Sequence, residues 1–408
     1  AGRMPYWRIS GFYFFYFAAL GALVPYWGLY LKTLGFSALQ IGQLMALPMA
    51  TKVVAPYLWG WLGDRLDRRM AIVRSGSLAA FLTFGRGFWL PEFWGLAVAL
   101  ALFSFFWDAV LPQLEVVTFS HLGDSVSRYS RIRVWGSIGF MLAVTALGPA
   151  VDETGPAIIL YVLLFIYGGI WIASLLIPEG RTGHHGEGHL SLRGTLIQGH
   201  VLAFFAACLL MQAGHGAYYT FYSIYLEGFG YSKAVIGQLW ALGVGAEVVL
   251  FVLFMHRLLD VFGAHMVLLA SLLLAAVRWV LIALFPDSLA VLAGAQLLHA
   301  ATFGSFHASA IHLVYRYFRG RLQGRGQALY SSLSFGAGGA LGSLASGGKF
   351  ICWLIGSDMY VHLQRKWWGR LFKPMMRRAD ATLCMGENSK LRLQEFGWPA
   401  ERVFVGVN

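Results

Sequence analysis

Long apolar runs, each close to the length that crosses a lipid bilayer, recur along most of this sequence. A spanning helix needs about 20 predominantly apolar residues, and eleven runs approach that length before residue 346. We therefore predict an all-α integral membrane protein. The runs occupy Ile9 to Leu31, Ile41 to Leu62, Met70 to Leu90, Phe93 to His121, Val134 to Val151, Pro156 to Ile177, Gly199 to Leu226, Val235 to Met255, Gly263 to Phe285, Ser288 to Tyr315 and Gly326 to Ala345.

The composition supports a membrane location and argues against other classes. Hydrophobic residues make up 58% of the 408 residues and charged residues only 12%, which is too apolar for an ordinary soluble enzyme. The net charge of +12 does not indicate a nucleic-acid partner, because Lys and Arg in short membrane loops report orientation instead. The three cysteines lack the spacing of a disulfide framework or a zinc site, and we expect no metal and no cofactor.

The order of the runs predicts two halves joined by a polar linker. Six runs form an N-terminal half at 1–178, and five form a C-terminal half at 198–346, from which a twelfth helix is missing. The linker at 179–197 contains three histidines, which we interpret as part of a solvated connector rather than as a metal site. Residues 347–408 form a separate segment. The linker histidines are His184, His185 and His189.

The distribution of arginine between loops predicts the orientation in the membrane. Alternate loops are rich in arginine, whereas the loops on the opposite side carry little beyond Lys32, Arg86 and Lys233. Cytoplasmic loops hold an excess of Lys and Arg. We therefore expect a multi-pass protein of the inner cell membrane with its N-terminus in the cytoplasm.

The loop after the second run, GWLGDRLDRR, carries the most specific local motif. It resembles the cytoplasmic-loop signature G-x-L-x-D-R-x-G-R-R of the major facilitator superfamily, although Asp67 stands where the signature has a glycine. Gly60 would permit a close helix approach, and Asp64 could accept from a helix N-terminus and pair with arginines. We expect a gating loop; the alternative is that its charges only set orientation. The matching residues are Gly60, Leu62, Asp64, Arg65, Arg68 and Arg69.

Four further stretches carry a second resemblance. They are RYSRIRVWGSIGF, AGHGAYYTFYSIYLEGFGYSKAVIGQLWALGVGAEVVLF, LLAAVRWVLIALF and QLLHAATFGSFHASAIH. They are similar to the 3-phenylpropionate transporter group and its proton-symporter relatives, and the likeness covers roughly Trp7 to Ala345. The resemblance implies twelve helices, alternating access and uptake of a small organic acid with protons. This sequence departs from it by lacking the twelfth helix.

Five ionisable residues lie within the apolar runs, namely Lys52, Asp108, Glu115, Glu247 and Arg278. Each would cost at least about 2.5 kcal/mol in a bilayer unless it were paired or hydrated, so we expect them to face a cavity. Asp108 and Glu115 are seven residues apart and share one helix face. Glu247 and Arg278 lie on consecutive helices and could form a pair that protonation breaks; a permanent structural ion pair is the alternative.

Histidines and tyrosines add candidates for substrate contact and proton transfer. His215, Tyr218 and Tyr222 share one helix face, which would suit an aromatic or phenolic ligand. We expect the neighbouring glycines, Gly214 and Gly216, to weaken this helix and to open its backbone to a cavity. His299, His307 and His312 lie along the tenth run and titrate in a range suited to proton transfer. The alternative is a hydrogen bond to a neighbouring helix.

The C-terminal segment alternates between predicted strands and helices. Strands are predicted at 350–355, 381–385 and 403–405, with helices near 363–378 and 388–397 between them. This βαβαβ pattern indicates a short α/β fragment. Its GSD and RRADATLCMGENSKLRLQEFGWPAERVFVGVN resemble part of the N-terminal lobe of GT-B glycosyltransferases. We hypothesise a truncated or joined reading, in which a foreign fragment replaces the last transporter helix.

Together these features predict a secondary active transporter rather than an enzyme. The expected function is proton-coupled uptake of a small carboxylic acid, in one reading an aromatic one, by alternating access. Transport of sugars or nucleosides and efflux are alternatives, because fold-level resemblance does not fix the ligand. A membrane-anchored glycosyltransferase is the alternative from another class. We expect a monomer whose partners are the substrate, protons and the lipid bilayer.

Overall fold

The computed structural model describes residues 4–66, 68–87, 91–122, 129–180, 193–319 and 322–347, together with the short segments 351–354, 381–385 and 403–406. The first part of the chain folds into α1 (Tyr6–Thr33), α2 (Ala38–Thr51), α3 (Ala55–Leu66), α4 (Arg69–Arg86), α5 (Phe93–Leu122), α6 (Tyr129–Thr154) and α7 (Ile158–Leu176). The helices α2 and α3 form one pass that is interrupted just before Pro56. Proline causes such breaks because it cannot donate to the carbonyl one turn earlier.

The second part contains a further five passes. They are built from α8 (Arg193–Leu196), α9 (Gly199–Gly228), α10 (Lys233–Leu253), α11 (Met255–Leu284), α12 (Leu289–Leu297), η3 (Ala300–Ser305), α13 (Phe306–Tyr317), α14 (Gln323–Ser331), η5 (Ser332–Gly338) and α15 (Gly339–Gly347). The segments η3 and η5 are π-helical turns within the tenth and eleventh passes. In α11, Gly263 adopts a positive φ of 74°, which separates a short lead-in helix from the pass itself, at the residue where the predicted run begins.

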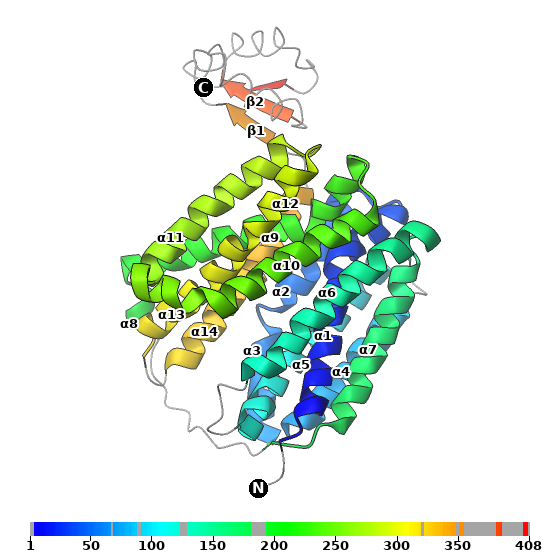
Figure 1. Cartoon of the computed structure of the whole chain (residues 1–408), viewed down its shortest axis with the longest axis vertical. Coiled ribbons are helices and arrows are strands. Elements are labelled where there is room, and N and C mark those ends of the chain that lie inside the picture. Colours follow the sequence, from blue (N-terminus) through cyan, green and yellow to red (C-terminus); the bar gives the residue numbers. More distant parts are fainter. Residues whose placement is uncertain are drawn as a thin grey trace.

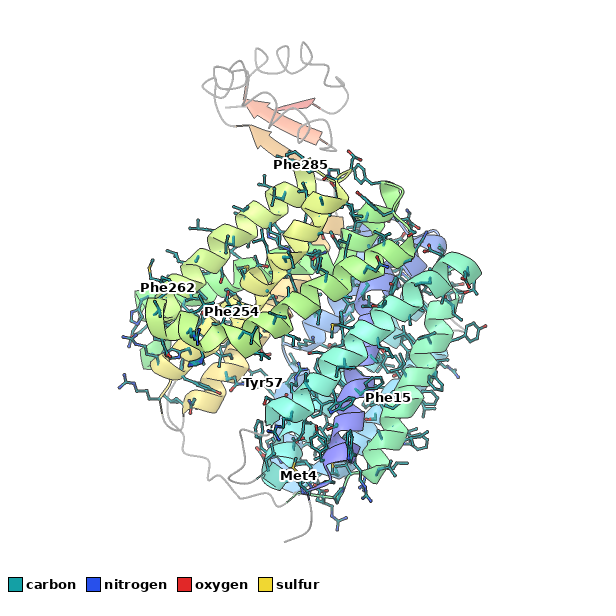
Figure 2. All side chains as sticks on the ribbon, in the orientation of Figure 1. Met4, Phe15, Tyr57, Phe254, Phe262 and Phe285 are labelled. Atoms are coloured by element: carbon teal, nitrogen blue, oxygen red, sulfur yellow. The ribbon has the colours of Figure 1, made fainter. Side chains whose placement is uncertain are left out.

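The predicted runs each coincide with a helical pass. Nine helices of the described residues are long and apolar enough to cross a membrane; α4 and the α14–η5–α15 pass complete the eleven. Exposed aromatic side chains, including Phe254, Phe262 and Phe285, lie on the outside of the bundle (Figure 2), as expected for surfaces that contact lipid. Among the described residues, no helix follows α15.

The passes form two bundles that meet along a central seam (Figure 1). In the first half, α1 packs against α6 and α7, and α5 packs against α4 and α2. In the second half, α9 packs against α15 and η5, while α11 packs against η3 and α13. The two halves touch chiefly where α6 meets α10, α2 meets α15 and α1 meets α9. Residues at this seam can therefore interact with both halves.

Three short strands follow the helical region. The strands β1 (Ile351–Leu354), β2 (Ala381–Met385) and β3 (Val403–Gly406) form a parallel sheet in the order β1-β2-β3. Ile351 is in register with Ala381, and Thr382 with Val403. The three predicted strands are confirmed. The helices predicted between them lie outside the described residues, and the likeness to a glycosyltransferase lobe stays a prediction.

Candidate functional site

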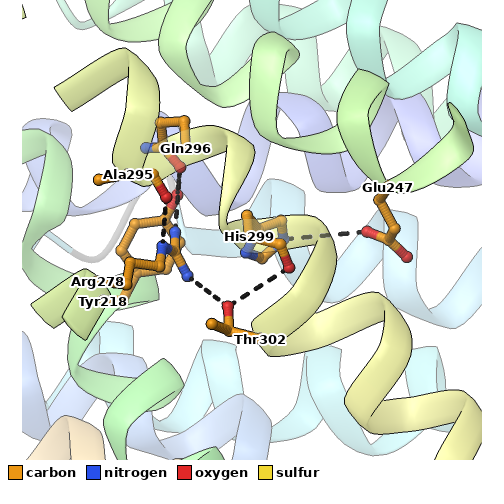
Figure 3. Close-up of polar contacts among 7 residues, drawn as sticks. All are labelled: Tyr218, Glu247, Arg278, Ala295, Gln296, His299 and Thr302. Atoms are coloured by element: carbon orange, nitrogen blue, oxygen red, sulfur yellow. Dashed lines mark hydrogen bonds and ion pairs between the residues drawn. The ribbon is translucent and has the colours of Figure 1, made fainter. Parts of the chain in front are cut away.

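The centre of the second half is organised around Arg278, a guanidinium with no exposed surface. Its Nε donates to the carbonyl of Ala295 at 3.0 Å, its Nη1 to Oγ1 of Thr302 at 3.2 Å and its Nη2 to Oε1 of Gln296 at 3.0 Å (Figure 3). The guanidinium also lies 4.4 Å from the ring centroid of Tyr218. Neutral oxygens and an aromatic face therefore compensate this buried charge.

Glu247 approaches a histidine rather than the arginine. Its Oε2 lies 3.9 Å from Nε2 of His299, and the two side chains are 22% and 6% exposed. The expected pair between Glu247 and Arg278 was wrong, because the α12–η3 junction supplies the acceptors for the guanidinium. His299 lies between the two residues (Figure 3). It therefore connects the carboxylate of α10 with the polar cluster of α11 and α12.

The face of α9 that carries His215, Tyr218 and Tyr222 is part of this cluster. The hydroxyl of Tyr218 donates to Oε1 of Gln296 at 2.9 Å, and the ring of Tyr218 lies 4.7 Å from that of Tyr222. His215 is fully buried, with Nδ1 located 3.0 Å from the carbonyl of Met211. Its ring lies 5.9 Å from that of His299. Residues that the sequence placed on separate helices thus share one buried site.

The glycines beside His215 do not open the helix as expected. The helix α9 continues unbroken from Gly199 to Gly228. A Cβ at Gly216 would overlap the carbonyl of Gly339, and a Cβ at Gly214 would lie 3.1 Å from the indole nitrogen of Trp279. These two glycines therefore allow close packing of neighbouring elements rather than access to backbone.

Several buried polar atoms of this cluster make no hydrogen bond within the described residues. They are Nε2 of His215, the hydroxyl of Tyr222, Nε2 of Gln296 and Nδ1 of His299. Buried polar groups in proteins are nearly always hydrogen-bonded, and exceptions often mark functional sites. The hydroxyl of Tyr222 and the amide nitrogen of Gln296 can donate a hydrogen bond, and Nδ1 of His299 can donate in one tautomer. These donors suit an electronegative group, such as an oxygen of a substrate. Because Nδ1 of His215 faces a carbonyl and carries the proton, Nε2 of the neutral ring is an acceptor instead.

A row of stacked rings continues from the cluster along the tenth pass. The rings of His299 and Phe303 are 5.4 Å apart at an angle of 10°, and those of Phe303 and His307 are 6.2 Å apart at 13°. Nδ1 of His307 lies 3.0 Å from the hydroxyl of Tyr330. His312, in contrast, is exposed. His299, which is buried, and His307, which is half-buried, therefore both stack against the ring of Phe303.

In the first half, the two acidic residues of α5 have separate partners. Oδ2 of Asp108 accepts from Oγ1 of Thr51 at 2.8 Å, and Lys52 acts on Asp108 electrostatically. Oε1 of Glu115 accepts from the hydroxyl of Tyr129 at 3.0 Å. The shared helix face was predicted correctly, but each carboxylate is held by a hydroxyl group that the sequence did not identify.

Arg133 of α6 is a cation within electrostatic range of carboxylates in both halves. Its guanidinium is 3.7 Å from the ring centroid of Phe17, and its charge acts on Glu115 of the first half and on Glu247 of the second. The side chain is half-buried. Nothing in the sequence sets Arg133 apart from Arg128 and Arg131, although it is the last of the three before the apolar residues of the fifth run begin.

Two further residues of the site were not predicted, although their spacing in the sequence indicates them. Gln296 and Thr302 stand three residues before and three residues after His299, and this spacing places side chains on one helix face. Both residues bind Arg278. Helical spacing from a predicted histidine could therefore have found them.

The predicted gating loop is held together within the first half. Arg69 donates to Asp64 and, at 2.6 Å, to Oε1 of Gln113, which in turn donates to the carbonyl of Trp59 at 3.0 Å. Arg65 lies over the ring of Trp61 at 5.1 Å. Arg68 immediately precedes α4 and is exposed. Asp67 lies outside the described residues.

The expectation for Gly60 was wrong, because a neighbouring glycine has the close contact. A Cβ at Gly60 would meet nothing within 4 Å, whereas a Cβ at Gly63 would lie 2.5 Å from Oε1 of Gln113. Gly63 therefore makes room for the amide that anchors Arg69.

The described residues contain no group of three or more His, Cys, Asp or Glu that could hold a metal ion. The linker histidines at 184, 185 and 189 lie outside the described part of the chain.

Two helical bundles that enclose buried charges at their seam define a membrane transporter of the major facilitator type. The model of the MFS_1-like family matches residues 6–359, and the chain belongs to this family. The expectation of a transporter rather than an enzyme is confirmed by the family and by the relatives that follow.

The relatives are named for the transport of different kinds of molecule. The chain is 28% identical to the "Probable 3-phenylpropionic acid transporter" of Escherichia coli (strain K12), over 84% of this chain and 90% of that protein. It is also 28% identical to the maltose permease of Geobacillus stearothermophilus, over 85% and 88% of the two chains. The structure of the nucleoside transporter NupG matches with a TM-score of 0.74 at 18% identity, over 84% of this chain and 90% of that one. This last likeness concerns the fold alone.

Proposed function

We propose that the chain is a proton-coupled importer of a small carboxylic acid, and that the acid carries an aromatic ring. The observation that carries this proposal is the position of Arg133 beside Phe17, within electrostatic range of both Glu115 and Glu247. A guanidinium presents planar donors suited to a carboxylate. Phe17 and the rings around Tyr218 would contact the aromatic part of the substrate.

The charges around Arg133 give a physical reason why substrate binding would be coupled to the uptake of a proton. When Glu115 and Glu247 are both ionised, their two negative charges outnumber the single positive charge of Arg133 that acts on them. A substrate carboxylate would add a further negative charge in a low-dielectric seam, which is unfavourable. Protonation of Glu247 as the substrate binds would keep the total charge constant. One proton per carboxylate is therefore the stoichiometry that this arrangement favours.

The proposal also includes how the two halves move and which further residues support transport. We infer alternating access between an N-terminal half at 1–178 and a C-terminal half at 198–346, with the Gly60–Arg69 loop as a gate. Lys52 and Asp108 would support the first half electrostatically, and His307 would assist proton transfer. The cytoplasmic N-terminus, the inner-membrane location and the monomeric state belong to the same proposal.

The test is uptake into proteoliposomes with and without an inward proton gradient. The panel contains 3-phenylpropionate, maltose and a nucleoside, since relatives are named for transport of each class. We expect gradient-driven uptake of the aromatic acid. Uptake of maltose or the nucleoside alone would replace our substrate class with that alternative.

Matched variants test the two residues that carry the proposal. Arg133→Gln should reduce uptake of the acid by about 100-fold, the scale of losing a charge-assisted pair, whereas Arg131→Gln, at an exposed position two residues away, should leave it unchanged. Glu247→Gln should abolish the dependence on the proton gradient. Exposed Glu92 provides the control Glu92→Gln. Unchanged uptake in Arg133→Gln, or unchanged proton dependence in Glu247→Gln, would overturn the respective role.

A further inference from the structure

A cluster of four charged residues joins the halves at the end of the molecule where α1 finishes and α10 begins. Glu227 of α9 accepts from Nζ of Lys32 at 2.8 Å and lies 3.0 Å from Nζ of Lys233. Asp152 of α6 accepts from the backbone N–H groups of Lys233 and Ala234 at 3.0 and 2.9 Å, so it caps the N-terminus of α10. We call Lys32, Asp152, Glu227 and Lys233 the seam cluster.

The seam cluster links both halves in two ways. Among the described residues, Lys32–Glu227 is the ion pair that connects the first half with the second. The cap from Asp152 is a second connection, because α6 and α10 belong to different halves. The loops on this side carry few basic residues, and two of the three noted there are Lys32 and Lys233. Two of the three basic residues on this side of the membrane therefore lie where the two halves meet.

Close helix contacts lie directly beside the cluster. The hydroxyl of Tyr26 donates to the carbonyl of Val144 at 2.6 Å. A Cβ at Gly148 would lie 2.5 Å from the carbonyl of Lys233, and a Cβ at Gly237 would lie 2.5 Å from that of Val144. The backbones of α6 and α10 therefore approach each other closely here, around the hydroxyl of Tyr26.

The same close approach occurs between the other helix pairs of the seam. A Cβ at Gly28 of α1 would lie 2.9 Å from the carbonyl of Thr220 in α9, and a Cβ at Gly42 of α2 would lie 2.6 Å from that of Ser343 in α15. At the opposite end, in contrast, the bonds of Arg69 remain within the first half. Contacts between the halves are therefore concentrated at the end that holds the seam cluster.

We infer that the seam cluster is an ionic latch that holds this end of the transporter closed, while substrate exchanges through the other end. The inference rests on the proposed alternating access. The side chains of Lys32 and Glu227 are 48% and 25% exposed, so they can be hydrated again when the halves separate. Exposed ion pairs are weak individually, which allows a latch to open within a transport cycle.

Distances between the halves test the latch directly. Nitroxide spin labels are placed at the exposed positions 153 and 287, at the latch end of each half, in full-length protein whose native cysteines are serine. Pulsed dipolar spectroscopy then gives the populations of the short, closed distance and of a longer, open one. Glu227→Gln removes both of its ion pairs and should raise the open-to-closed ratio about 5-fold, the scale of losing two exposed pairs.

A double-mutant comparison separates the latch from a general loss of stability. Lys32→Gln should raise the ratio by itself but should have no further effect in a Glu227→Gln background, because its partner is already gone. Glu92→Gln, an exposed charge on the same side, should change nothing. Equal ratios in all variants, or independent effects of Lys32→Gln and Glu227→Gln, would overturn the latch. The measurement needs no substrate, so its failure is distinct from failure of the proposed function.

Discussion

The contact between Gly216 and Gly339 predicts that adding a single methyl group in α9 destabilises the protein. In Gly216→Ala, the new Cβ would overlap the carbonyl of Gly339. The overlap involves backbone on both sides, so no side chain can rotate away. The substitution would therefore force α9 away from α15, next to the buried His215.

The magnitude follows from two opposing terms. Replacing glycine by alanine within a helix gains about 1 kcal/mol. Overpacking a tight contact costs about 1–3 kcal/mol, and a backbone contact belongs at the upper end of that range. We therefore expect a net loss of about 1–2 kcal/mol. The matched control is Gly294→Ala in α12, where a Cβ would meet nothing within 4 Å. There the gain in helix propensity acts alone and should raise the free energy of unfolding.

The assay can use the buried thiol of Cys208. With the other two cysteines replaced by serine, a thiol-reactive fluorophore reports unfolding as Cys208 becomes exposed during a thermal ramp in detergent. We expect Tm to fall by about 2–4 °C in Gly216→Ala and to stay level or rise in Gly294→Ala. A rise of similar size in both variants would refute the close approach of α9 to α15.

Two further predictions concern buried hydrogen bonds and use the same thermal assay. Gln113→Leu leaves Arg69 without its amide acceptor and should destabilise the first half by about 1–3 kcal/mol, whereas an unchanged Tm would mean that the amide does not anchor the loop. Tyr26→Phe removes a 2.6 Å hydrogen bond and should lower the free energy of unfolding by about 1 kcal/mol. It should also raise the population in which the seam cluster is open. A lower open population would contradict the role given to Tyr26.

Hydropathy was sufficient to predict the passes. Span length is a property of one segment and of the bilayer, so no partner helix is needed to recognise it. The break before Pro56 and the kink at Gly263 were not predicted, although both arise from local backbone properties of proline and glycine. The three C-terminal strands were found for the same reason, because short apolar segments between polar turns can be read one at a time.

Contacts between helices were predicted less well, because they depend on which helices become neighbours. Glu247 and Arg278 were paired by sequence order, but the acceptors for the arginine come from the following pass. The motif position indicates Gly60 as the closely packed glycine, although only the position of Gln113 shows that Gly63 is the crowded one. Arg133 gains its importance from Glu247, a residue of the other half.

The wide turns η3 and η5 have a consequence for how the second half can change shape. A π turn holds more residues than an α turn, so moving it along a pass turns the intervening residues by roughly the 100° that separates neighbouring side chains. His299 immediately precedes η3, and Phe303 lies within it. Migration of the π turn could therefore change which way the rings of His299, Phe303 and His307 face. Both ends of the pass would stay in place, and the helix would keep its backbone hydrogen bonds.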